Sequence, residues 1–126
     1  MPRIMIVDDD RTTVKLLQTL LEMDGFEVSM ATHGQQAMEL AREVKPDAFL
    51  VDYHLIDMPG IELIEQLRSD SLFATTPIVM ASGLDVETDA LKAGANTFLV
   101  KPFEPGKLAG VFLDLIGQTR LSPRPD

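Results

Sequence analysis

The sequence predicts an α/β fold in which helices cover both faces of a parallel five-stranded sheet. Short apolar runs alternate with stretches whose apolar residues recur every three or four positions, a pattern typical of parallel strands connected by helices. Gly or Pro stands near the end of most helical stretches, where these residues end helices. With 126 residues, 45% of them apolar, the chain is long enough for one domain with a substantial core.

The five predicted strands are residues 4–7, 27–31, 48–51, 77–81 and 97–100. The first, third and fourth runs are apolar almost throughout, as expected of strands that are buried on both faces. The second run contains Glu27 and Ser29, so we place it at an edge of the sheet.

The predicted helices are residues 12–23, 35–44, 61–67 and 107–116, together with a short helix from about residue 86 to Gly94. In the first of them the residues on one apolar face are Val14, Leu17, Leu20 and Leu21. We expect residues 1–118 to form the domain. Residues 119–126 are polar and contain two Pro and two Arg, which predicts a disordered tail or the start of a linker.

Composition and charge exclude several classes of function. The net charge of −9 disfavours direct binding to nucleic acid or to an anionic membrane, because both are polyanions. The chain has no Cys, which excludes disulfides and thiolate metal sites. It has neither a signal peptide nor an apolar run of the roughly 20 residues that cross a bilayer, so we expect a cytoplasmic protein.

Polar residues follow four of the predicted strands. These residues are Asp8, Asp9 and Asp10 after the first strand, Asp52 after the third, Ser82 after the fourth and Lys101 after the fifth. Ligands of doubly wound sheets bind beyond the carboxyl ends of the strands. We therefore expect these acids, the hydroxyl and the amine to converge on one site.

Crowded carboxylates stay ionised only where a cation neutralises them. Mg²⁺ prefers oxygen ligands and binds one or two carboxylates together with phosphate oxygens, and Lys101 supplies a further positive charge. A carboxylate beside a metal ion and an amine is a plausible nucleophile toward phosphorus. The cluster therefore predicts a site for phosphoryl transfer.

Four motifs in register, "IMIVDDD", "DAFLVDYHL", "PIVMASG" and "GANTFLVKPF", carry a family resemblance. Over residues 3–118 the chain resembles the receiver domains of two-component response regulators, in particular the single-domain regulators of the chemotaxis type. The resemblance implies a flavodoxin-like (βα)5 fold with strand order 2-1-3-4-5. It also implies a cis peptide bond between Lys101 and Pro102.

The resemblance assigns Asp52 as the phosphoacceptor. Asp8 and Asp9 match the acidic pair that binds Mg²⁺, with Mn²⁺ as a possible substitute. His54 would add its backbone carbonyl to the metal ligands. These roles are implied by the family motifs and not by spacing alone.

Three further residues match family positions. Ser82 would bond a phosphoryl oxygen, Lys101 matches the family lysine, and Phe98 matches the aromatic residue that turns inward on activation. The implied function is a phosphorylation-activated switch rather than an enzyme, catalysing only its own phosphorylation and dephosphorylation. Its phosphodonor would be a histidine kinase or a phosphotransfer protein. Its output would be a protein target or a homodimer, bound through the face formed by the fourth helix, fifth strand and fifth helix.

Two alternatives stay open. Asp8, Asp10 and Thr12 also match the Asp-x-Asp-x-Thr motif of haloacid-dehalogenase-like phosphatases, with Asp8 as nucleophile and Asp10 as acid/base. That reading leaves Asp52 without a role and lacks a late acidic pair for the metal, and Asp10 also fits a helix N-cap. The second alternative is a degenerate receiver that acts only as a binding module.

Overall fold

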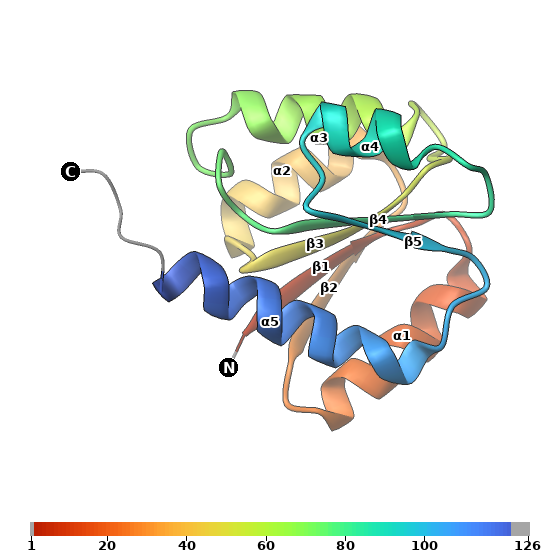
Figure 1. The fold of residues 1–126 in the computed structure, drawn as a ribbon, viewed down its shortest axis with the longest axis vertical. Coiled ribbons are helices and arrows are strands. Elements are labelled where there is room, and N and C mark those ends of the chain that lie inside the picture. The colour runs from red at the N-terminus through yellow and green to blue at the C-terminus, as the bar shows by residue number, and fades with distance from the viewer. Residues whose placement is uncertain (1, 122–126) are drawn as a thin grey trace.

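The computed structural model describes residues 2–121 and shows one parallel sheet with the strand order β2-β1-β3-β4-β5 (Figure 1). The strands are β1 (Arg3–Val7), β2 (Glu27–Ala31), β3 (Ala48–Asp52), β4 (Ile78–Ser82) and β5 (Thr97–Val100). The predicted order is confirmed, and β2 lies at an edge as its polar residues indicated.

The helices are α1 (Arg11–Met23), α2 (Gly34–Val44), α3 (Gly60–Ser69), α4 (Glu87–Ala93) and α5 (Leu108–Leu121), with a 3-10 turn η1 (Pro105–Lys107) before α5. Helices α2, α3 and α4 cover one face of the sheet, and α1 and α5 cover the other (Figure 1). Side chains of successive strand residues point to opposite faces of the sheet. Met5 packs under α2 and α3, whereas Ile4 and Ile6 pack under α1 and α5.

Four strand ends differ from the prediction by one residue each. Strand β1 begins one residue earlier than expected, and β4 begins one residue later. Strands β3 and β4 run one residue further than expected, because Asp52 pairs in register with Ala81 and Ser82 with Val100. Asp52 and Ser82 are therefore the last residues of strands, whose backbones are held by neighbouring strands, and not the first residues of loops.

The predicted helix boundaries need one notable correction. Helix α5 continues to Leu121, past the predicted end at residue 116 and into the first residues of the predicted tail, whose remainder lies outside the described residues. Asp10 is the N-cap of α1, where its side chain accepts hydrogen bonds from the amides of Thr12 and Thr13, as its position suggested. The Lys101–Pro102 bond is cis, as predicted. Among residues 2–121 no helix is both long and apolar enough to traverse a bilayer.

Arg68, near the end of α3, ties this helix to two loops on the same side of the sheet. Its half-buried guanidinium donates hydrogen bonds to the carbonyls of Phe73 (2.8 Å), Thr76 (2.7 Å) and Gly94 (2.9 Å) and to Oδ1 of Asn96 (2.9 Å). Desolvation lowers the pKa of Arg68 from its ordinary value. The planar guanidinium satisfies acceptors that a single ammonium could not reach together.

Replacing Arg68 with Ala is expected to lower the free energy of unfolding by about 3 kcal/mol, because several acceptors lose a charged donor. Arg68→Lys should recover part of that loss. The matched control is Arg42→Ala, which breaks an exposed ion pair with Asp70 and should cost less than about 1 kcal/mol. Urea denaturation measures all three variants, and equal losses for Arg68→Ala and Arg42→Ala would contradict the prediction.

Candidate functional site: a carboxylate cluster at the carboxyl edge of the sheet

The carboxyl ends of β1, β3, β4 and β5 bring the predicted site residues together. Asp8 follows β1, Asp52 ends β3, Ser82 ends β4 and Lys101 follows β5. Strand β3 lies between β1 and β4, and all the strands are parallel. The side chains that follow them therefore meet at one edge of the sheet.

Lys101 bridges two of the carboxylates. Its Nζ lies 2.6 Å from Oδ1 of Asp52 and 3.2 Å from Oδ2 of Asp8. The side chains of Asp8 and Asp52 are only 7% and 12% exposed, so water screens this interaction weakly. One cation therefore holds acids from two different strands.

The protonation equilibria of the site reflect this crowding. Desolvation raises the pKa of Asp8 and the charge of Asp52 adds to the rise, although the Asp10 amide and Lys101 oppose it. Burial alone would lower the pKa of Lys101, but its hydrogen bond to Asp52 and the two negative charges raise that pKa above its ordinary value. Lys101 is therefore cationic at neutral pH. For Asp8, burial makes the ionised form less favourable than it is in water.

The donor set fits a hard divalent cation. Asp8, Asp9 and Asp52 each offer a carboxylate oxygen, and these three atoms lie within 4.8 Å of one another. Asp8 is buried and Asp9 is exposed, so the group opens toward solvent on one side. An all-oxygen set with an open side matches the preference of Mg²⁺, which keeps several of its waters. The group could hold such an ion.

His54 contacts the cluster through its backbone, whereas the side chain of Asp10 is directed away from it. The backbone N–H of His54 donates to Oδ2 of Asp52 at 3.2 Å, so the loop after β3 lies against the carboxylate. Asp10 is turned away: its Oδ1 caps α1 and its Oδ2 accepts from the Thr13 hydroxyl at 2.7 Å. That hydroxyl and the Thr13 amide lower the pKa of Asp10. Because both carboxylate oxygens are engaged at the start of α1, the geometry disfavours the phosphatase alternative, in which Asp10 is the acid/base.

Ser82 and Phe98 lie on adjacent strands near the cluster. Ser82 is buried, and its Oγ accepts a hydrogen bond from the Leu84 amide at 3.0 Å. No atom lies within 4 Å of a Cβ built on Gly83, so the turn after Ser82 is open. Phe98 is half-buried and packs against the core under α2, α3 and α4.

Two contributors to the site were not identified from the sequence. A Cβ on Gly60 would collide with the backbone carbonyl of Asp52, so glycine at the first position of α3 allows the end of β3 to lie where it does. Asp57 bonds the start of α2 from a distant loop. No local pattern reveals either contact, because each joins residues that only the folded chain brings together.

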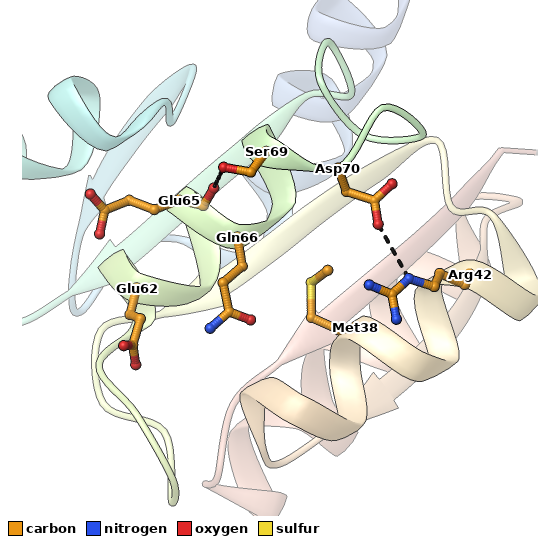
Figure 2. Close-up of a pocket in the computed structure, with 7 residues that line it drawn as sticks. All are labelled: Met38, Arg42, Glu62, Glu65, Gln66, Ser69 and Asp70. Carbon is orange, nitrogen blue, oxygen red and sulfur yellow. Dashed lines mark hydrogen bonds and ion pairs between the residues drawn. The ribbon is translucent and has the colours of Figure 1, made fainter.

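A separate groove of about 480 Å³ lies between α2 and α3 (Figure 2). It is lined by Met38, Arg42, Glu62, Glu65, Gln66, Ser69 and Asp70. The Arg42–Asp70 ion pair spans one end of it at 3.2 Å. None of these residues belongs to the carboxylate cluster, so the groove and the candidate site are distinct.

Comparison with known proteins identifies the family. The family model of the response regulator receiver domain matches residues 4–112, and the chain therefore belongs to that family. It is similar to the alkaline phosphatase synthesis transcriptional regulatory protein PhoP of Bacillus subtilis (39% identity, 82% of this chain, 43% of that protein). It is also similar to the transcriptional regulatory protein ZraR of Klebsiella oxytoca (36% identity, 97% of this chain, 28% of that protein).

A solved structure supports the same assignment. The receiver domain of Francisella response regulator 1452 superposes with a TM-score of 0.88 at 27% identity, covering 94% of this chain and 99% of that one. The chain spans less than half the length of the two curated relatives named above. The similarity therefore extends over only part of those proteins.

Proposed function

We propose that this receiver domain is a signalling switch that accepts a phosphoryl group on Asp52. The observation that carries the proposal is the bridging of Asp8 and Asp52 by Lys101 within a cluster that also contains Asp9. Such a cluster combines a carboxylate nucleophile, a fixed cation and an oxygen-only metal site. A binding module that had lost the switch would not need this combination.

In the proposed reaction, a carboxylate oxygen of Asp52 bonds to phosphorus while the bond from phosphorus to the donor breaks. Asp8, Asp9 and Asp52, with the backbone carbonyl of His54, would hold Mg²⁺, or Mn²⁺ in its place. The ion would supply charge neutralisation for the phosphoryl oxygens. Lys101 already contacts Asp52 and offsets the negative charge that transfer brings into the site. The donor would be a histidine kinase or a histidine phosphotransfer protein.

The proposed output uses the face formed by α4, β5 and α5. Ser82 would move to bond the phosphoryl group and Phe98 would turn inward, which changes the packing of this face. Each of these elements has an exposed apolar side chain: Leu91 of α4 is 46% exposed, Val100 of β5 61% and Leu113 of α5 53%. Exposed apolar residues of this size suit a protein partner or a second copy of the chain. The net charge of −9 disfavours nucleic acid as a direct ligand of this domain.

Mapping the phosphorylated residue tests the proposal. The protein is incubated with acetyl phosphate and Mg²⁺, reduced with borohydride to convert any aspartyl phosphate to homoserine, and analysed by mass spectrometry. We expect the modification at Asp52 and its loss when EDTA removes the metal. Modification at Asp8 instead would support the phosphatase alternative, and no modification at any Asp would support a degenerate receiver.

A further inference from the structure

The loop that follows the acceptor strand is closed at its base by backbone contacts. The amide of Gly60 donates to the carbonyl of Tyr53, the amide of Leu55 donates to the carbonyl of Met58 at 3.2 Å, and an antiparallel bridge joins His54 to Pro59. These contacts make residues 53–59 a hairpin-like projection. Its backbone lies against Asp52 through the His54 amide.

The tip of this projection is anchored to a different helix. Oδ1 of Asp57 accepts a hydrogen bond from the amide of Gly34 at 2.7 Å, and Oδ2 accepts one from the amide of Gln35 at 3.1 Å. These are the first two amides of α2, whose own N-cap, His33, makes no side-chain capping bond. A carboxylate on free amides at a helix N-terminus makes charge-assisted bonds and is favoured by the helix dipole. Asp57 therefore supplies, from the loop after β3, the capping hydrogen bonds that the N-cap residue His33 does not make.

Packing beside this cap joins the same two segments. Gly34 is buried, and a Cβ on it would overlap the side chain of Met58. Met58 also contacts α3, where its Sδ accepts a weak hydrogen bond from Nε2 of Gln66 at 3.9 Å. The tip of the loop is thus held between α2 and α3.

Helix α2 is a firm anchor because it packs on the sheet. Ala37, Met38 and Ala41 of α2 are buried in the core under that face. Within residues 53–59 the proline is Pro59 at the base of the loop, so no proline ring restricts the backbone at the tip. Its conformation therefore depends on its contacts at the base and at Asp57.

We infer that Asp57 is a positioning residue for the metal and phosphoryl site: by holding the loop tip on α2, it sets the place of the His54 backbone beside Asp52. The inference rests on the proposed function, in which the His54 carbonyl is a metal ligand. Asp57 itself contacts neither metal nor phosphate. Asp57 would support the His54 backbone from outside the set of metal ligands, so its loss would displace that ligand without removing it.

Mg²⁺ titration of purified variants tests the inference. Tyr53 is the only Tyr and the chain has no Trp, so the intrinsic fluorescence reports on the residue next to Asp52. Asp57→Ala is expected to weaken Mg²⁺ binding about tenfold. Asp57→Asn keeps one oxygen that can accept an amide and should weaken binding only about threefold.

Asp70→Ala is the matched control. Asp70 also accepts a backbone amide, from Leu72 at 3.0 Å, and pairs with Arg42 of α2 at the far end of the groove in Figure 2. The substitution removes the same charge and a comparable contact, and it should leave Mg²⁺ affinity within about twofold of wild type, as surface pairs contribute little. Thermal denaturation of each variant, measured alongside the titration, shows whether the variant is folded.

Two results would overturn the inference. Asp57→Ala could bind Mg²⁺ as tightly as wild type, or the Ala and Asn variants could be weakened equally, which would make the effect one of net charge and not of position. Either result, obtained while wild type binds Mg²⁺ and is modified at Asp52, leaves the proposed function standing. Wild-type protein that binds no Mg²⁺ contradicts the proposed function, and the inference falls with it.

Discussion

Asp52→Asn is expected to reduce phosphorylation by acetyl phosphate to background. The amide of Asn has the shape of the carboxylate and can still accept a hydrogen bond from Lys101, but it carries no charge and is not a nucleophile toward phosphorus. The change therefore removes the reacting oxygen with little disturbance of the strand end. Incorporated label is measured by mass spectrometry of the intact protein after a fixed incubation with Mg²⁺.

The control for this experiment is Asp114→Asn. Asp114 is an exposed residue of α5, so this variant changes the net charge equally and should be labelled like wild type. Full labelling of Asp52→Asn would transfer the acceptor role to another carboxylate. Asp8, which lies within the same cluster, is the first candidate to map.

Gly60→Ala is expected to destabilise the protein by about 3 kcal/mol or more, because overpacking against backbone cannot be relieved by a side-chain rotation. A Cβ at this position meets the carbonyl oxygen of Asp52, and its next contact is the side chain of Met80 at 3.0 Å. Either α3 or the end of β3 must move. Because the displaced carbonyl belongs to Asp52, labelling by acetyl phosphate should fall together with stability.

Gly110→Ala is the matched control for the same substitution. Gly110 lies in α5, and no atom is within 4 Å of a Cβ built on it. Ala is the better helix former, so this change should be neutral or stabilising by up to about 1 kcal/mol. Urea denaturation compares the two variants, and a loss of less than about 1 kcal/mol for Gly60→Ala would show that the neighbouring backbone yields easily.

The fold was largely predictable because its elements are encoded locally. Buried strands on a parallel sheet must be apolar on both faces, and β1, β3 and β4 have that composition. Helix faces such as that of α1, with Val14, Leu17 and Leu21 buried, follow from the helical period. The extension of α5 was not predicted, because residues after 116 have no clear apolar periodicity. The strand ends at Asp52 and Ser82 were not predicted, because pairing with a neighbouring strand extends a strand beyond its apolar run.

The candidate site was predictable to the extent that it lies at strand ends. Once the strands are parallel, Asp8, Asp52 and Lys101 must lie at the same edge of the sheet. Their roles are implied by the family motifs and stay predictions. Asp10 was expected to cap the helix that follows it, and the structure confirms this, because its carboxylate accepts hydrogen bonds from the amides of Thr12 and Thr13 in α1.

The sequence by itself determined which segments form strands and helices and which polar groups follow each strand, because backbone preference and burial depend on neighbours within a few positions. Only the tertiary structure decided that Asp57 caps α2 and that Gly60 leaves room for the Asp52 carbonyl. It also placed Arg68 between two loops. Such contacts join residues that are far apart in the chain. They stabilise the protein only once the sheet and its helices have folded, because only then do the partners lie within hydrogen-bonding distance.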